Sequence, residues 1–337
     1  MINHLLYLYT ESPLHAGAAA SDGVVDLPIQ REVATGYPLV WGQSLKGALR
    51  QAARDRGMEE EFGADVVNEV FGPPPPRPNA EDHERGVNPH AGLLRVGDAQ
   101  LVALPVSTMQ RTFAWASSAL ALSRLARKYQ IADLSADLPD IPAPAHGRGY
   151  AADPVWVGAE HEEQIVGPCV VNLAAHTLAP ANSAEPAEGD QAGTGRAQDP
   201  TAVVISDEDP VRRWGDLLSR HALGERVALG PFATKLTQDL FVVGEDVMQL
   251  LVRQGTEYTI RTQLDPGTKT VNQLFSSEYL PAETILAAVL TLRPHPDNGD
   301  YHQFLLQELL GESVVQIGGD ETIGKGLTWT RLVGDDR

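Results

Sequence analysis

The chain has 337 residues, of which 42% are hydrophobic and 21% charged, a composition that can bury a core and excludes a wholly disordered protein. Acidic residues outnumber Lys and Arg by 45 to 26, so the net charge of −19 excludes a promiscuous polyanion binder but still allows a local basic groove. The single cysteine, Cys169, excludes an internal disulfide and a cysteine-rich zinc site. The sequence also has no signal-peptide pattern and no apolar run near ~18 residues. Together these features predict a cytoplasmic protein that does not contact membranes.

The first part of the chain predicts a strand, an extended segment and a helix. Residues 2–11 are apolar and β-prone and predict a buried strand. Pro28 makes the segment 24–32 extended or looped and not helical. A helix is expected from Ser44, which would cap it, to residue 57. Its apolar face contains Leu45, Ala48, Leu49 and Ala52. Its exposed face is basic and contains Lys46, Arg50, Arg54 and Arg56.

Two segments of biased composition interrupt the middle of the chain. Residues 72–92, with the run PPPPRP, predict a surface loop, and residues 179–200, rich in Ala, Glu, Gly and Pro, predict a disordered insertion. Between them, a strand is expected over 93–106 and a helix from Thr112 to Tyr129.

The last third of the chain predicts further interleaved elements. Residues 256–280 alternate around Pro266 and Gly267, which predicts a long β-hairpin. A strand is expected over 235–243, and two short strands close the chain around the glycine-rich loop. Helices are expected over 211–223, 281–291 and 299–310. Strands interleaved with helices predict an α+β fold with long excursions from a compact sheet.

The glycine-rich loop from Gly319 to Gly326 resembles a phosphate-binding P-loop but lacks its chemistry. Gly326 follows Lys325 where a P-loop has a hydroxyl for Mg²⁺, and the residues after it alternate as a strand where a helix is required. A tight hairpin with glycines at positive φ is therefore expected. Alternatively, the glycines let another polymer approach the backbone, with Lys325 meeting a phosphate.

Candidate chemistry centres on one carboxylate and one imidazole. The ten histidines show no metal-ligand spacing, and only His15, at the end of the first strand, stands out. Asp26 lies in an apolar segment stiffened by Pro28, where an unpaired buried charge is costly. It either pairs with Arg31 or with backbone amides, or it is presented on a loop to hold a divalent cation or accept a proton. The residues alone leave both interpretations open.

Five segments then occur in a characteristic order. They are SPLHAG (12–17), VDLPIQREVATGYPLVWGQSLKGALR (25–50), RTFAW (111–115), EYLP (278–281) and IGGDETIGKGL (317–327). Together, between residues 5 and 332, they resemble the backbone subunit of the Cmr, type III-B, CRISPR ribonucleoprotein, in the RAMP superfamily. The glycine-rich segment alone indicates only the superfamily, whereas DLPIQRE followed by SLKGALR is specific to this subunit.

The resemblance implies one RAMP-type domain over 1–337. Its fold would be a modified RRM-like, ferredoxin-like palm with a β-hairpin thumb at 256–280 and inserted loops. Copies of the chain would stack head to tail along a guide (CRISPR) RNA together with other Cmr subunits. The thumb would flip a base of the guide–target duplex at regular intervals, and target RNA would be cut there in a reaction that depends on a divalent cation, Mg or Mn.

The resemblance also assigns roles to residues. Asp26 falls at the position of the family's catalytic carboxylate, as metal ligand or base, with His15 at a neighbouring motif position. Glu278 and Tyr279 would support it, although Ser277 stands where relatives often carry a second acid. The expected guide-RNA contacts are Ser44, Lys46, Arg50, Gly318, Gly319 and Lys325.

Two other functions remain open at this point. A purely structural filament subunit would need Asp26 for assembly and not for cleavage. Neutralising Asp26 therefore distinguishes this structural subunit from a subunit that cleaves target RNA. A stand-alone guide-processing endonuclease of the same superfamily typically relies on histidine chemistry and needs no DLPIQRE segment.

Overall fold

The computed structural model describes most of the chain. The described residues are 1–18, 25–73, 91–134, 137–157, 162–177, 204–265, 267–268, 270–295 and 299–334. The predicted insertions at 72–92 and 179–200 lie almost entirely outside these residues, as does Pro266 of the predicted turn.

The described residues form two compact units, each assembled from separate stretches of sequence. Unit 1 contains 1–104, 124–137 and 255–337, and unit 2 contains 105–123 and 138–254. The expected single domain over 1–337 stays a prediction. The mixture of helices and strands confirms the predicted α+β class.

Unit 1 is built on an antiparallel sheet around the first strand, β1 (Ile2–Thr10). The strand order is β13-β14-β1-β12-β4, with β2 on β4 and β3 on β12. The bounds are β2 (Leu39–Val40), β3 (Leu94–Val96), β4 (Ala99–Ser107), β12 (Ile285–Leu292), β13 (Glu312–Gln316) and β14 (Leu327–Val333). Residues 4–10 of β1 are all buried, which confirms the predicted buried strand.

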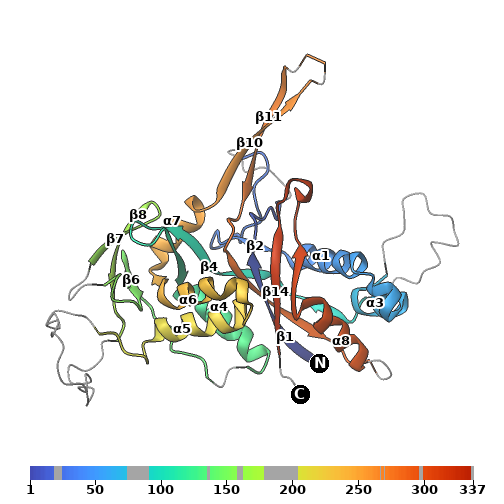
Figure 1. Cartoon of the computed structure of the whole chain (residues 1–337), viewed down its shortest axis with the longest axis horizontal. Coiled ribbons are helices and arrows are strands. Elements are labelled where there is room, and N and C mark those ends of the chain that lie inside the picture. The colour runs from blue at the N-terminus through green and yellow to red at the C-terminus, as the bar shows by residue number, and fades with distance from the viewer. Residues whose placement is uncertain are drawn as a thin grey trace, which may run out of the picture. The chain divides into compact units, whose positions relative to one another are not determined.

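Four helices belong wholly to unit 1, together with a short 3₁₀ turn, η3 (Glu321–Ile323). The helices are α1 (Gly42–Asp55), α2 (Met58–Phe62), α3 (Ala64–Phe71) and α8 (Gly299–Leu310). Figure 1 shows α1, α3 and α8 together on one side of the sheet strands β1 and β14. Leu45, Leu49 and Ala53 are buried on the apolar face of α1, so burial of this face holds the helix against the sheet. Another helix, α4 (Ala119–Ile131), carries the chain from unit 2 to unit 1.

A two-stranded hairpin of β10 (Glu257–Leu264) and β11 (Val271–Tyr279) also belongs to unit 1 and confirms the hairpin predicted over 256–280. Figure 1 shows it as a long arm that extends beyond the sheet strands of the unit. At its base Tyr279 and Glu278 are buried, whereas the outer part of β11 is exposed. The side chain of Asp265 accepts hydrogen bonds from the amides of Gly267 and Thr268, which closes the turn.

Unit 2 contains a mixed sheet of order β5-β9-β6-β8-β7. Its strands are β5 (Phe113–Ser118), β6 (Arg148–Ala151), β7 (Glu162–Val166), β8 (Cys169–Ala174) and β9 (Leu240–Val243). The helices are α5 (Pro210–Leu218), the π-helical turn η1 (Ser219–Leu223), the 3₁₀ turn η2 (Val227–Leu229), α6 (Gly230–Gln238) and α7 (Glu245–Gln254).

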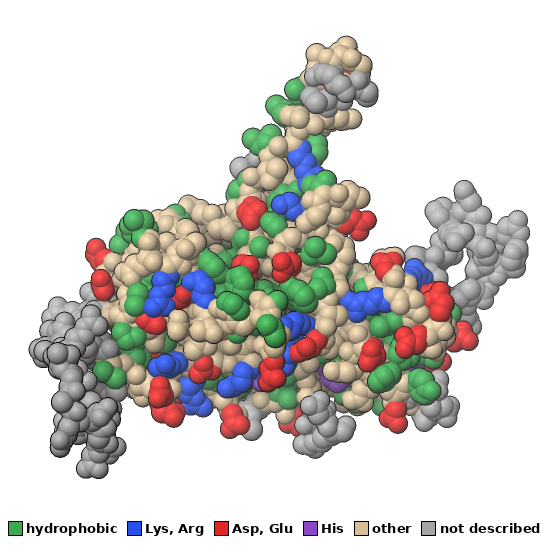
Figure 2. Space-filling model, viewed as in Figure 1, with side chains coloured by type: hydrophobic (Ala, Val, Ile, Leu, Met, Phe, Trp, Pro, Cys, Tyr) green, Lys and Arg blue, Asp and Glu red, His purple; other side chains and the backbone are tan. Residues whose placement is uncertain are grey.

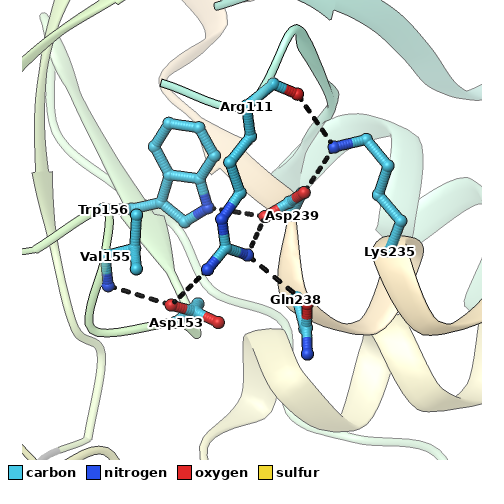
Figure 3. A network of polar contacts seen from close by, with 7 residues as sticks. All are labelled: Arg111, Asp153, Val155, Trp156, Lys235, Gln238 and Asp239. Carbon is cyan, nitrogen blue, oxygen red and sulfur yellow. Dashed lines mark hydrogen bonds and ion pairs between the residues drawn. The ribbon is translucent and has the colours of Figure 1, made fainter.

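A buried carboxylate organises the core of unit 2 (Figure 3). Asp239, with 1% of its surface exposed, accepts hydrogen bonds from Arg111 (2.8 Å), from the indole of Trp156 (2.8 Å) and from Lys235 (2.5 Å). Arg111 also pairs with Asp153 at 3.3 Å. Two cations and an indole donor compensate the burial of the charge, and they join the RTFAW segment to α6.

Three predicted elements are wrong or displaced. The helix predicted from Thr112 begins only at Ala119, because residues 113–118 form β5 in parallel with β9. The strand predicted over 235–243 begins at Leu240, after the end of α6. The helix predicted over 281–291 is strand β12, which pairs with β1 and β4. A continuous apolar run fits a central strand as well as a buried helix, so its period does not decide between them.

The predicted cap of α1 is also wrong. The helix begins at Gly42 and not at Ser44, and the side chain of Asp98 accepts the Gly42 amide at 2.7 Å. A residue distant in sequence therefore supplies the polar partner that Ser44 was expected to provide. In the part of the chain that the structure describes, no helix is long and apolar enough to cross a membrane.

Candidate active site and nucleic-acid interface

Asp26 is an exposed carboxylate at the base of the hairpin, held by one residue of β11. Its Oδ2 accepts hydrogen bonds from the Ser276 amide (2.8 Å) and hydroxyl (3.0 Å). The hydrogen bond from the backbone amide of Ser276 is the main reason why the pKa of Asp26 lies below its ordinary value. The pairing with Arg31 is wrong and the pairing with a backbone amide is confirmed, while the side chain faces solvent and is not buried.

The segment that carries Asp26 is extended because it adds to the edge of β11. The Leu27 amide donates to Ser276 O at 3.0 Å, and the Glu278 amide donates to Leu27 O at 3.0 Å. A parallel bridge joins Leu27 to Ser277. The extended conformation predicted from Pro28 is confirmed, and its partner strand lies about 250 residues further along the sequence.

Glu278 is a buried carboxylate with several hydrogen-bond partners, and its predicted supporting role in cleavage stays a prediction. Only 2% of the residue is exposed. Its Oε2 accepts the Ile29 amide at 3.0 Å, and its Oε1 accepts Arg31 at 2.5 Å, Thr256 at 2.9 Å and Tyr258 at 3.3 Å. Both carboxylate oxygens are therefore engaged within the protein. Glu278 acts on the site by fixing the segment after Asp26 to the hairpin.

His15 lies beside Glu278. Its Nδ1 is 2.7 Å from the backbone oxygen of Glu278, so Nδ1 donates and Nε2 is the basic nitrogen. A Cβ on Gly17 would lie 2.9 Å from His15 Nε2, so a side chain at position 17 would require the imidazole ring to move. The backbone oxygen of His15 also accepts the Gly319 amide at 3.0 Å, which brings the glycine-rich loop to the segment that follows β1.

Tyr279 belongs to a charged cluster that the sequence did not reveal. Its hydroxyl donates to Asp320 Oδ2 at 2.8 Å, and Arg261 binds both oxygens of the same carboxylate at 2.8 and 2.5 Å. Burial is the main reason why the pKa of Tyr279 is raised, so the phenol stays a donor. The ammonium of Lys325 lies 4.9 Å from the ring centre. The cluster joins the hairpin base to the glycine-rich loop.

Sequence reasoning missed Ser276, Arg261 and Asp320 as residues of this region. Asp320 lies inside the segment IGGDETIGKGL, so its motif was the available signal. Neither Ser276 nor Arg261 stands in a recognised motif. Their roles follow only from the pairing of β10 with β11 and from the position of the hairpin base.

A groove of about 580 Å³ lies between α1 and the glycine-rich loop of unit 1. Its lining includes Gln43, Ser44, Gly47, Gln51, Gln316 and Gly318. Gly318 has φ +81°, and a Cβ there would lie 2.3 Å from the backbone oxygen of His15. The loop can therefore come this close only with glycine at the position. Two predicted guide contacts, Ser44 and Gly318, thus line one groove.

Lys46 and Arg50 are not among the residues that line this groove. Lys46 donates to the carbonyl of Leu94 at 2.7 Å, and Arg50 donates to the carbonyl of Pro73 at 3.1 Å. Desolvation is the main reason why the pKa values of both cations are lowered. The helix face predicted to be exposed is half-buried at these two residues, and their predicted contact with guide RNA stays a prediction.

The described residues contain no group of three His, Cys, Asp or Glu side chains that could hold a metal ion. That part of the chain therefore has no metal site made of three or more such protein side chains. Mg²⁺ commonly takes one or two carboxylates and completes its shell with phosphate oxygens and water. Asp26, exposed and ionised, fits such a shared site.

Comparison with known proteins finds relatives that match nearly the whole chain. The chain is 29% identical over 334 residues to the CRISPR system Cmr endoribonuclease Cmr4 of Pyrococcus furiosus, covering 98% of this chain and 95% of the relative. The crystal structure of oligomeric Cmr4 from Pyrococcus furiosus matches with 24% identity and a TM-score of 0.66 over both whole chains. A chain of the type III-B Cmr-beta complex bound to cognate target RNA matches with 18% identity and a TM-score of 0.65, covering 98% of this chain and 97% of that chain.

These structural matches show that the chain has the fold of those proteins. The family model described as the RAMP superfamily matches residues 7–328, a span that includes both units, Asp26 and the glycine-rich loop. The chain belongs to the RAMP superfamily.

Proposed function

We propose that this chain is the guide-RNA-binding backbone subunit of a type III-B CRISPR effector complex and cleaves complementary target RNA at regular intervals. The observation that carries the proposal is an exposed, ionised and oriented Asp26 in a chain that resembles a Cmr endoribonuclease over 98% of its length. The oligomeric Cmr4 crystal and the Cmr-beta complex with target RNA support stacked copies, other Cmr subunits and RNA as partners.

In this proposal the sheet of unit 1 is the RRM-like palm and the hairpin of β10 and β11 is the thumb. Figure 2 shows hydrophobic side chains along the hairpin. Tyr258, Ile260 and Leu274 are 53%, 73% and 61% exposed. Ile260 lies opposite Ser276 and Leu274 lies opposite Thr262, so this apolar side is the side that carries Ser276. Apolar side chains of this kind can separate stacked bases, which would place a displaced nucleotide near Asp26.

The cleavage itself requires little covalent chemistry from the protein. RNA supplies its own nucleophile, the 2′-hydroxyl, and the site has to align it with the phosphorus and the leaving oxygen. A general base works best with a pKa near the operating pH, whereas the pKa of Asp26 lies below the ordinary carboxylate value. Asp26 therefore suits a role as cation ligand and electrostatic anchor better than a role as base. His15 is the other candidate for proton transfer, with Nε2 as the ring nitrogen that is not bound to the Glu278 carbonyl.

A divalent cation, Mg or Mn, would be held by Asp26 and by oxygens of the RNA, and it would supply charge neutralisation at the phosphate. Asp26 would fix the position of that charge, while the apolar hairpin residues would limit the access of water. The guide would run along the groove, where the Ser44 hydroxyl and the Gly318 amide offer hydrogen-bond donors to a sugar-phosphate backbone. Lys325, at the same loop, would add positive charge.

The test is Asp26→Asn in the complex assembled on guide RNA. This change keeps the size of the side chain and removes its charge. We expect unchanged assembly and target binding and a loss of about 10²-fold or more in the regularly spaced cuts. Chelation of divalent cations from the unmodified complex should have the same effect. Asp265→Asn is the matched control, because Asp265 is likewise a carboxylate that accepts hydrogen bonds from backbone amides in the same hairpin.

The alternative of a purely structural filament subunit gives a different result. In that case Asp26→Asn would disturb assembly, or would leave the cuts unchanged with binding intact. Either result would reject the assignment of cleavage to Asp26. Loss of cleavage in Asp265→Asn as well would indicate a general effect of charge on the hairpin.

A further inference from the structure

Ser276 and Asp26 are joined by three reciprocal hydrogen bonds. The amide and the hydroxyl of Ser276 both donate to Oδ2 of Asp26, at 2.8 and 3.0 Å. The amide of Asp26 donates back to the hydroxyl oxygen of Ser276 at 3.0 Å. Among the described residues, no hydrogen bond joins another residue to Oδ1 of Asp26. The two carboxylate oxygens are thus in different environments, one bound to the hairpin and one not.

This asymmetry fixes an orientation. Rotation about the last side-chain bond exchanges the two oxygens of an aspartate, and an exposed carboxylate normally rotates easily. Two donors on the same oxygen oppose that rotation. The serine hydroxyl has a second effect, because it also accepts the amide of Asp26 and so holds the backbone at this residue. A backbone donor alone would give one of these three bonds.

The neighbouring hydroxyls do not share this arrangement. Ser277 is fully buried, and its hydroxyl makes no hydrogen bond to Asp26. Thr259 lies directly opposite Ser277 on β10, on the other face of the hairpin from Ser276, and is exposed. Ser276 is therefore distinguished by its position on the hairpin face next to Asp26.

We propose that Ser276 is a positioning residue that turns Oδ1 of Asp26 toward the substrate. The inference rests on the proposed cleavage function, which it deepens by naming the residue through which the hairpin orients the carboxylate. Ser276 touches neither the RNA nor the reacting atoms in this role. It acts through Asp26, and small errors in the placement of a reacting group cost large factors in rate.

The experiment measures single-turnover cleavage and target-RNA affinity in the assembled complex for three variants. Ser276→Ala keeps the backbone bond and removes two of the three hydrogen bonds. We expect a cleavage rate constant about 10- to 100-fold lower with an unchanged Kd for target RNA. Ser276→Thr retains the hydroxyl and should recover most of the rate. Thr259→Ala, the matched control, removes a hydroxyl from the other face of the hairpin and should cleave at the normal rate.

Two outcomes overturn the inference alone. Cleavage at the normal rate in Ser276→Ala would show that the hydroxyl is not needed. Equal loss in Ser276→Thr and Ser276→Ala would show that the hydroxyl is not what matters. The Tm of each variant is measured as well and should lie within about 2 °C of that of the unmodified chain. This control shows that a lower cleavage rate does not result from unfolding of the variant.

A double variant separates this inference from the proposed function. Asp26→Asn combined with Ser276→Ala should cleave no more slowly than Asp26→Asn alone, because Ser276 acts only through Asp26. A further loss in the double variant would overturn the positioning role and leave the cleavage function standing. Normal cleavage in Asp26→Asn alone would instead overturn the proposed function.

Discussion

Replacing Glu278 by Gln should destabilise unit 1 strongly without any direct effect on RNA chemistry. The glutamate side chain is 3% exposed and pairs with Arg31, whose side chain is 24% exposed, at 2.5 Å. Removing one partner of a buried ion pair costs about 3–5 kcal/mol, because the other charge stays desolvated. Arg31 keeps partial contact with water and a bond to the Gly36 carbonyl, so the lower end of that range applies. We expect a loss of about 3 kcal/mol in the free energy of unfolding.

A loss of that size should be visible in thermal unfolding. A unit of this length loses about 2–4 °C in Tm for each kcal/mol, so the transition of unit 1 should fall by about 6–12 °C. Circular dichroism and urea unfolding of the full chain measure both quantities. Glu257→Gln is the matched control, because Glu257 is an exposed carboxylate at the start of β10 in the same hairpin. It should change the Tm by less than about 2 °C.

A double-mutant cycle tests the cause. Arg31→Gln alone should also destabilise, and the double variant should lose clearly less than the sum of the two single losses, with a coupling of at least about 1.5 kcal/mol. A Tm for Glu278→Gln within 2 °C of the unmodified chain, or additive effects in the cycle, would refute the view that Glu278 is a structural hub.

Two further predictions concern one partly buried and one fully buried carboxyl group. Burial raises the pKa of Glu283 to about 7, so the folded state holds a proton that the unfolded state releases above pH ~4.5, and stability should fall as the pH rises through this window. In the unmodified chain the free energy of unfolding, measured with urea, should therefore fall by about 1–2 kcal/mol between pH 5 and 8, a figure that allows for the partial exposure of Glu283. Glu283→Gln should remove this fall, and the same pH dependence in both proteins would contradict the prediction. Asp239→Asn should cost unit 2 about 3 kcal/mol or more, since Arg111 and Lys235 lose their shared carboxylate, and a loss below about 1 kcal/mol by the same assay would be incompatible with the network in Figure 3.

Local sequence patterns determined the elements whose signals are themselves local. The hairpin over 256–280 followed from residue alternation around a turn, and the final helix, 299–310, agrees with α8 to the residue. The rejection of a P-loop was correct for the same reason. The residues after Gly326 alternate, and they form strand β14 where a nucleotide-binding loop needs a helix.

The helix predicted over 281–291 failed because its decisive partners are distant. Residues 285–292 form a nearly continuous apolar run that suits a helix or a central strand. The choice is made by hydrogen bonds to β1 and β4, both of which lie in the first third of the chain. Ser44 failed as a cap for the same physical reason, because Asp98 reaches the helix start from another element.

The candidate site also combines a feature that the local sequence predicts with partners that only the fold decides. The need of Asp26 for a partner could be inferred from its place as a carboxylate in an apolar extended segment. Arg31, five residues away, was a plausible partner, but the fold pairs Arg31 with Glu278 and gives Asp26 to Ser276. Both partners come from β11, about 250 residues along the chain. Residue type and neighbours determine which groups need a partner, whereas strand pairing between distant segments decides which partner each group receives.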